Sequence, residues 1–334
     1  MTLGAPIRSR WVRAEPRRDV ALRVLERIIR AEFPQGKIVG VQPMEGLRNA
    51  NFKIELDNRA EAVVVRIYEH DRSLCQKELD LFRLIGNLVP VPEFIHAEPE
   101  EMDDVPPFAI LEFVEGVTFR DLKCTRNLEA IGQAAYAVGQ TLAALGLTTF
   151  PASGWLGPGP KVTEPLLEGS DPTPRFLDEC LTSENLVKWT DAKVRDQLHE
   201  LVWAHAGQFS EMDKSAHLVH GDFGKRNILV REAEGDWVVA TVLDWEFAVS
   251  ASPLIDVGHF LRYERCSRPL VEPEFSRGFV EAGGDLPPDW RRLARIVDCL
   301  ALCESLTHDR IPDEFACELA ELIRATAEDR DPCL

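Results

Sequence analysis

The apolar positions of the first third of the chain follow the short spacing of β-strands. Runs rich in β-branched residues, or alternating in polarity, predict five strands, at residues 38–41, 52–56, 62–68, 94–97 and 108–113. Helical spacing replaces this pattern at 19–33 and at 71–88, where Pro90 and Pro92 follow and end the helix. This part of the chain is therefore predicted to form a sheet with two helices.

After Gly116 the pattern becomes mainly helical. Helical spacing covers 128–147, 175–188, 191–211 and most of the chain after Leu254, with a Pro- and Gly-rich irregular stretch at 150–174 and two short strands at 228–230 and 238–243. We therefore expect an α+β protein with a β-rich N-terminal lobe, residues 1–115, and a mainly helical C-terminal lobe, residues 116–334. The segment 111–116 would form the hinge between the lobes.

Composition and charge exclude some classes of protein. Of the 334 residues, 45% are apolar and 28% are charged, so a globular core is expected. The net charge of −18 argues against nucleic acid as a partner, because phosphate binding needs a basic face. It is compatible with a cationic small molecule drawn to an acidic cleft. An acidic surface that only keeps the protein soluble is the alternative.

The sequence indicates neither a membrane span nor a zinc site. No apolar run reaches the roughly 18 residues that a membrane span needs, and the eight Cys are scattered without zinc spacing. We expect a cytoplasmic protein with reduced thiols. The Arg-rich first 30 residues have the charge of a targeting segment, but they contain one Ser and continue into the helix at 19–33, so we favour a folded surface helix.

Residues 220–227 carry the clearest chemical signal. The catalytic loop of kinases has a His, an Asp and an Asn at the offsets of His220, Asp222 and Asn227, and Gly221 stands here in place of Arg. An Asp in such a loop can orient a hydroxyl nucleophile and take its proton, and an Asn can give a neutral oxygen to Mg²⁺. Capping of turns is the structural alternative for the Asp and the Asn.

A second carboxylate follows one hairpin later. Asp244 comes directly after the strand predicted at 238–243. Mg²⁺ in phosphoryl-transfer sites is bound by one or two carboxylates plus substrate phosphates, and a strand end is a natural place for such a ligand. Together the two segments predict phosphoryl transfer. Lys225 and Arg226 are candidates for contact with the γ-phosphate, with a solvated loop face as the alternative.

The N-terminal lobe offers a candidate phosphate-binding pair. Arg66 lies in an apolar strand and Glu78 in the helix that follows, where kinases place a strand Lys and its helix Glu. Arg can bind phosphate through its planar fork, although it is not equivalent to Lys. Glu69 and Asp80 are alternative partners for this cation.

Two loops are candidates for nucleotide contact. Residues 45–52, which include Asn51, could cover the phosphates with backbone N–H groups, although the loop is not G-x-G-x-x-G and the chain has no Walker A sequence. Main-chain groups of the 111–116 hinge would bind an adenine ring.

These residues together resemble the aminoglycoside phosphotransferase family. The resemblance rests on the 218–229 loop, on Leu-Asp-Trp-Glu at 243–246, on Val-Arg-Ile at 65–67 and on the hinge at 111–116. The loop is similar in style to that of the hygromycin B phosphotransferases. The resemblance implies a protein-kinase-like bilobal fold, and transfer of a γ-phosphate from ATP or GTP, with Mg²⁺, to a small-molecule hydroxyl.

The resemblance also implies a role for each motif residue. Asp222 would be the catalytic residue, and Asn227 and Asp244 would bind magnesium. The nucleotide-binding residues would be Arg66, Glu78, Asn51, the Glu112 carbonyl and the Val114 amide, and the residues supporting the catalytic loop would be His220 and Asp256.

The acceptor is not fixed by these motifs. We expect an aminoglycoside-type antibiotic, selected by acidic residues of the helical lobe. The alternative within the same chemistry is a metabolite kinase acting on choline, homoserine, fructosamine, a macrolide or a similar acceptor. The alternative from another class is a nucleotide-binding module without catalysis, which the Arg in place of Lys would allow. A protein kinase is disfavoured, because no A-P-E segment follows Asp244.

Overall fold

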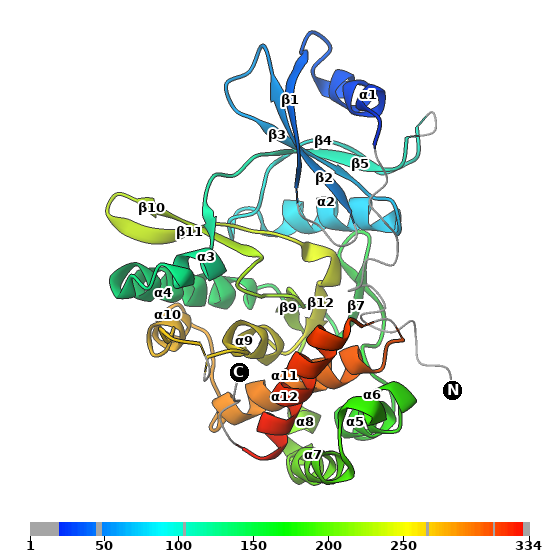
Figure 1. Cartoon of the computed structure of the whole chain (residues 1–334), viewed down its shortest axis with the longest axis vertical. Coiled ribbons are helices and arrows are strands. Elements are labelled where there is room, and N and C mark those ends of the chain that lie inside the picture. The colour runs from blue at the N-terminus through cyan, green and yellow to red at the C-terminus, as the bar shows by residue number, and fades with distance from the viewer. Residues whose placement is uncertain (1–19, 45–48, 103–104, 265–266, 310, 330–334) are drawn as a thin grey trace.

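The computed structural model describes residues 20–44, 49–102, 105–264, 267–309 and 311–329. Within these ranges the chain forms a β-rich lobe and, below it, a mainly helical lobe (Figure 1). The α+β organisation predicted from the sequence is confirmed. The Arg-rich residues 1–19 and residues 45–48 of the expected phosphate loop lie outside the described residues.

The N-terminal lobe is built on a five-stranded antiparallel sheet with the strand order β1-β2-β3-β5-β4. Its elements are α1 (Leu22–Glu32), β1 (Ile38–Met44), β2 (Ala50–Leu56), β3 (Val63–Ile67), α2 (Ser73–Ile85), β4 (Phe94–Glu98) and β5 (Phe108–Glu112). Each of the five strands and both helices predicted for this region is confirmed, with ends that differ by a few residues.

Alternation along β3 determines what each face of the sheet carries. Val63, Val65 and Ile67 pack in one apolar core with α1. Val64 and Arg66 point to the opposite face, where α2 lies between the sheet and the helical lobe (Figure 1). The two-residue period therefore places the Arg66 guanidinium on the side that faces the rest of the molecule.

The C-terminal lobe contains the remaining elements. Its helices are α3 (Phe119–Cys124), α4 (Leu128–Leu145), α5 (Pro172–Leu181), α6 (Glu184–Trp189), α7 (Ala192–Ala204), α8 (Ala206–Met212), α9 (Leu254–Leu261), α10 (Glu274–Glu281), α11 (Trp290–Leu306) and α12 (Asp313–Ala327). Its strands are β6 (Val117–Thr118), β7 (Gly154–Gly157), β8 (Lys161–Glu164), β9 (His217–Val219), β10 (Ile228–Ala233), β11 (Asp236–Val242) and β12 (Val249–Ala251). None of the helices in the described ranges has the length and apolar character needed to cross a membrane.

Two apolar cores organise the helical lobe. One core continues from α2 and the lower face of the sheet into α3, α4, α9 and α10. At the junction of the lobes, the ring of Phe82 meets Trp245 edge-on, with 6.3 Å between their centroids. The second core joins α5–α8 to α11 and α12. The lobes are thus connected by shared packing as well as by the chain.

Three details of the helical lobe differ from the sequence prediction. The stretch predicted to be irregular contains the β7–β8 hairpin and the start of α5 at Pro172. Proline fits the first turn of a helix, where its missing N–H is not needed, so this proline opens α5 instead of preventing it. The helices predicted at 175–188 and 191–211 are each divided in two, at Thr182–Ser183 and at His205.

Candidate active site

Helix α9 anchors the loop between β9 and β10 by its backbone. The buried Asp256 carboxylate accepts hydrogen bonds from the His220 N–H (2.7 Å) and the Gly221 N–H (2.9 Å). Burial raises the pKa of Asp256 to about 7, although the two N–H donors act in the opposite direction. The expected supporting position of Asp256 matches this geometry.

The imidazole of His220 connects the two halves of the motif. Its Nδ1 accepts from the Asp222 N–H (3.1 Å), and its Nε2 lies 2.8 Å from the Leu243 carbonyl oxygen, so Nε2 carries the proton. The ring is fully buried against Trp245 and Phe223. Burial lowers its pKa to about 4, which keeps the ring neutral at pH 7.

Gly221 is required by the backbone of this loop. Its φ is +78°, a conformation that costs an L side chain energy. A Cβ at this position would also lie well inside contact distance of the Phe247 carbonyl oxygen. The loop therefore has room only for glycine where kinases carry Arg.

Asp222 is held by side chains from two directions. Asn227 donates through Nδ2 to the Asp222 carboxylate and to the Asp222 backbone carbonyl, each at 3.0 Å. On the other carboxylate oxygen, His259 Nε2 of α9 approaches to 3.3 Å. Each of the two carboxylate oxygens thus has a side-chain neighbour.

The β10–β11 hairpin brings Asn227 next to Asp244. Ile228 pairs with Val242, and the Leu243 N–H donates to the Asn227 carbonyl at 2.8 Å. Asp244 follows with φ +60°, and its side chain is about two-fifths exposed. Two residues that are 17 positions apart in sequence therefore meet at one end of the hairpin.

Arg66 joins the N-terminal lobe to this site. Its Nη1 donates to both carboxylate oxygens of Glu78 at 2.9 Å, its Nε donates to Asn51 at 3.0 Å, and its Nη2 forms an ion pair with Asp244. Burial favours loss of the proton, but Glu78 and then Asp244 raise the pKa of Arg66 well above its usual value. Glu78 is therefore the partner of this cation, and the alternatives Glu69 and Asp80 are not.

The remaining nucleotide-binding candidates lie at the end of β5, in the segment after it and in β2. Glu112 ends β5, where its N–H donates to the Glu93 carbonyl at 3.0 Å. Val114 lies in the segment that connects β5 to β6. Asn51 pairs with Arg66 across β2 and β3, so its observed contact is with the cation.

Lys225 is placed away from the expected position beside the γ-phosphate. Its Nζ donates to the Phe260 carbonyl at the end of α9 and lies 4.5 Å from the centre of the Phe260 ring. Burial, followed by the charge of Lys123, lowers the pKa of Lys225 to about 7. We therefore do not retain it as a phosphate contact, and Arg226 is exposed.

The donor set fits a Mg²⁺ ion that arrives with a nucleotide. Asn227 uses its amide nitrogen on Asp222, which leaves its carbonyl oxygen as the ligand atom, and Asp244 adds a carboxylate. No group of three or more His, Cys, Asp and Glu side chains in the described ranges could hold a metal alone. Mg²⁺ needs no such group where substrate phosphates complete its coordination.

Sequence reasoning missed three residues of this site. Tyr68 donates to Glu78 at 2.5 Å, and Lys77 Nζ donates to the Glu246 carbonyl at 3.0 Å across the lobes. Tyr68 was detectable, because it lies two residues after Arg66 on the same face of the strand. His259 follows Asp256 by three residues, which is one helical turn. Lys77 had no such signal.

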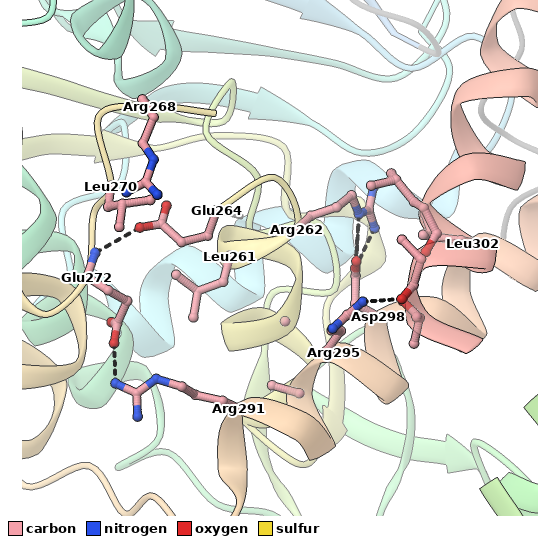
Figure 2. A pocket seen from close by; sticks show the side chains of 15 residues that line it. Leu261, Arg262, Glu264, Arg268, Leu270, Glu272, Arg291, Arg295, Asp298 and Leu302 are labelled. Carbon is pink, nitrogen blue, oxygen red and sulfur yellow. Dashed lines mark hydrogen bonds and ion pairs between the residues drawn. The ribbon is translucent and has the colours of Figure 1, made fainter. Parts of the chain in front are cut away.

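A cavity of about 360 Å³ lies in the helical lobe, between α9, α11, α12 and the segment after α9 (Figure 2). Four arginines line it, Arg262, Arg268, Arg291 and Arg295, together with acidic and aliphatic side chains. Arg262 forms a two-pronged ion pair with Asp298 at 2.7–3.1 Å. The walls of this cavity therefore carry both signs of charge.

The sequence matches one protein family over most of its length. Residues 40–296 match the model of the phosphotransferase enzyme family. No curated protein is significantly similar to the sequence.

Solved structures show the same fold at low sequence identity. A complex of APH(2")-IIIa with GDP and kanamycin is 17% identical, with a TM-score of 0.67, and the match covers 91% of this chain and 98% of that one. A thermostable mutant of APH(4)-Ia with AMP-PNP and hygromycin B is 18% identical, with a TM-score of 0.61 and coverage of 91% and 96%. APH(2")-IIa with streptomycin and ATP is 16% identical, with a TM-score of 0.61 and coverage of 93% and 98%. The expected protein-kinase-like bilobal fold is thereby confirmed.

Proposed function

The chain belongs to the phosphotransferase enzyme family, and we propose that it transfers the γ-phosphoryl group of ATP or GTP to a hydroxyl group of a small molecule. Asp222 is the proposed catalytic residue, and Asn227 and Asp244 are the proposed Mg²⁺ ligands. Arg66, held by Glu78, is the proposed phosphate-binding cation.

The observation that carries this proposal is the meeting of four separate segments at one place. Arg66 of β3 contacts Glu78 of α2 and Asp244 after β11. Asp244 in turn lies beside Asn227, which holds Asp222 at 3.0 Å. Residues that only cap turns would not need partners from both lobes. A cation, a metal-binding pair and a base in one place are the groups that phosphoryl transfer requires.

In the proposed reaction the acceptor oxygen attacks the γ-phosphorus in line. The new O–P bond forms as the bond to the bridging oxygen breaks, and a nucleoside diphosphate leaves. Asp222 orients the hydroxyl and takes its proton. Arg66 stabilises negative charge on the phosphates. Asn227 and Asp244 would hold Mg²⁺, which supplies positive charge to the phosphate oxygens.

The nucleotide would lie between the lobes. The Glu112 carbonyl and the Val114 amide of the linker are the proposed contacts of the base, and Asn51 supports the phosphate-binding cation. Three similar structures contain GDP, AMP-PNP and ATP, which supports the use of a nucleoside triphosphate here.

An aminoglycoside antibiotic is the leading proposal for the acceptor. The similar structures named above contain kanamycin, hygromycin B or streptomycin, and these molecules offer many hydroxyl groups. The net charge of −18 favours a cationic acceptor of this kind. Expression in a sensitive host would then raise resistance to at least one aminoglycoside.

A metabolite kinase of the same fold is the second candidate, with choline, homoserine, fructosamine, a macrolide or a similar molecule as the acceptor, because the family match does not name an acceptor. A panel of aminoglycosides and hydroxylated metabolites, read by release of nucleoside diphosphate, separates the two proposals.

The function is tested by Asp222→Ala on whichever acceptor the panel identifies. Removal of the base should lower kcat by at least about 100-fold, because a positioned base contributes roughly 10²–10⁴-fold. Nucleotide affinity, measured by calorimetry, should stay within about threefold, since Asp222 is proposed to act on the acceptor.

The matched control is Asp236→Ala, which removes an exposed carboxylate from the β10–β11 turn and should leave kcat unchanged. Wild-type turnover in the Asp222 variant would show that the assigned role is wrong. Nucleotide binding by the wild-type protein without transfer to any acceptor would favour a non-catalytic binding module.

A further inference from the structure

Two polar side chains of helix α9 face the catalytic loop. Asp256 and His259 are three residues apart and therefore lie on one face of the helix. Asp256 holds the loop backbone at His220 and Gly221. His259, one turn later, reaches the carboxylate of Asp222.

The contact is buried and specific to one nitrogen. His259 Nε2 lies 3.3 Å from Asp222 Oδ1, and the side chains are 8% and 18% exposed. The loop backbone passes close to the ring, since a Cβ on Gly224 would lie 3.4 Å from Nε2. At 3.3 Å the two atoms are in ion-pair contact and lie slightly farther apart than the roughly 2.7–3.2 Å of an ordinary N–H···O hydrogen bond.

The two carboxylate oxygens of Asp222 are thus contacted by side chains from different elements. Asn227, the residue before β10, donates to Oδ2 at 3.0 Å, and His259, on α9, faces Oδ1. One contact alone would let the carboxylate turn about its terminal bond, because this torsion is broad. Two contacts on different oxygens fix its plane. A carboxylate oxygen can accept more than one hydrogen bond, so the acceptor hydroxyl can still bind.

We propose that His259 is a positioning residue that donates from Nε2 to Asp222 and fixes the orientation of that carboxylate toward the acceptor hydroxyl. The proposal rests on the proposed function, in which Asp222 is the base. Groups that orient a reacting group in this way are worth about 10–100-fold in activity. A histidine that only fills space beside the loop would contribute to stability and not to kcat.

A matched pair of substitutions tests this role. In His259→Gln the amide nitrogen is as many bonds from Cα as Nε2, so it keeps a donor near Asp222. His259→Met has a similar length and no donor. We expect kcat to fall about 10–100-fold in H259M and to stay within about fivefold of wild type in H259Q, with KM for the nucleotide unchanged in both.

The comparison of the two variants decides the outcome. A kcat within twofold of wild type in H259M would overturn the proposal. Equal losses in H259M and H259Q, together with lower unfolding temperatures in both, would also overturn it, because they indicate packing alone.

A second measurement does not depend on turnover or on the stability of these variants. In ¹⁵N-histidine-labelled wild-type protein at pH 7, Nε2 of His259 should carry a proton, and its signal should shift in Asp222→Asn. An unprotonated Nε2, or a signal that is unchanged in that variant, would refute the contact. If the contact is present but no acceptor is phosphorylated, the proposed function has failed and the geometry has not.

Discussion

The neutral ring of His220 makes two hydrogen bonds that a protonated ring could not make together. Its Nδ1 accepts from the Asp222 N–H while its Nε2 donates to the Leu243 carbonyl. A proton on Nδ1 would remove the first bond and leave a charge buried among aromatic rings. The orientation of the catalytic loop therefore depends on the charge of this single side chain.

This dependence predicts a loss of stability in acid. The pKa of His220 is about 4 in the folded state, below the usual 6.5, so the unfolded state binds this proton more readily. The neutral His220 ring therefore contributes about 3 kcal/mol to the free energy of unfolding, and this contribution is fully present above pH 6.5 and is lost as the pH falls toward 4. In His220→Asn the free energy of unfolding, from urea titrations between pH 7 and 4.5, should fall less than in wild type.

Comparing wild type with H220N separates the effect of His220 on the pH dependence of stability from the effect of Asp256, which has the opposite sign. The pKa of Asp256 is raised to about 7, so its protonation stabilises the folded state as the pH falls below 7. Wild type and H220N both retain Asp256, and its effect cancels in their difference. Parallel slopes in wild type and H220N would refute the prediction.

At the scale of elements, the loop between β9 and β10 is shaped by the close approach of the chain at Phe247. Because an added Cβ would clash with the Phe247 carbonyl oxygen and because φ of Gly221 is +78°, we expect Gly221→Ala to destabilise the protein by more than about 3 kcal/mol. The positive φ alone accounts for about 1–2 kcal/mol, and the clash with the backbone accounts for the rest. Chemical denaturation measures the difference, and activity should be lost as well.

Gly235 separates the two causes. It lies in the β10–β11 turn with φ +93° and has no atom near the position of an added Cβ. Gly235→Ala should therefore cost about 1–2 kcal/mol, the penalty of the backbone conformation alone. If G221A proved no more destabilising than G235A, the approach of Phe247 would not be what excludes a side chain.

The elements were predictable where local pattern determines them. The run of β-branched residues predicted β3, which carries Arg66, and helical spacing predicted α2 and α4. The β7–β8 hairpin was missed, because its short strands lie between many Pro and Gly residues and because β7 is joined to the rest of its sheet by pairing with β12, which is distant in sequence. The division of helices at Ser183 and His205 likewise reflects packing around the second core, which the local sequence does not encode.

The site was predictable residue by residue only where a motif was present. The loop 220–227 and Asp244 have fixed spacing, and their meeting follows from one hairpin. The contact of Lys77 with the Glu246 carbonyl joins two positions that are 169 residues apart. No periodicity or spacing relates such positions, so contacts between the lobes could be found only from the structure.

At the scale of the whole molecule, the ion pair between Arg66 and Asp244 links the two lobes. In the proposed function Arg66 binds the nucleotide phosphates and Asp244 binds Mg²⁺, so each of these side chains would have to exchange its present partner. A nucleotide that binds together with Mg²⁺ would provide phosphate oxygens for Arg66 and the metal ion for Asp244. Nucleotide without metal would meet the negative charge of Asp244, which opposes its phosphates. Binding of metal and of nucleotide should therefore be strongly coupled in the wild-type protein.

The prediction is tested with Asp244→Asn. In wild type, the Kd of the nucleotide should rise about 10–100-fold when Mg²⁺ is removed, and in D244N the ratio should approach one, because the variant lacks the carboxylate that creates the coupling. Calorimetry with and without Mg²⁺ gives both ratios. Glu246→Gln, two residues further on, is the control and should keep the wild-type ratio. An unchanged ratio in D244N would exclude Asp244 as the origin of the coupling.

The apolar core shared by both lobes has a consequence for the synthesis of the chain. The apolar surface around Phe82 of α2 is completed by Trp245, which the ribosome adds more than 130 residues after Glu112. At a synthesis rate of roughly 5–20 residues per second, Trp245 is added about 10–30 s after Phe82 and its neighbours. The apolar surface of the nascent N-terminal lobe therefore stays exposed during this interval and can associate with other chains. The C-terminal half of the protein completes the folding of the half made before it.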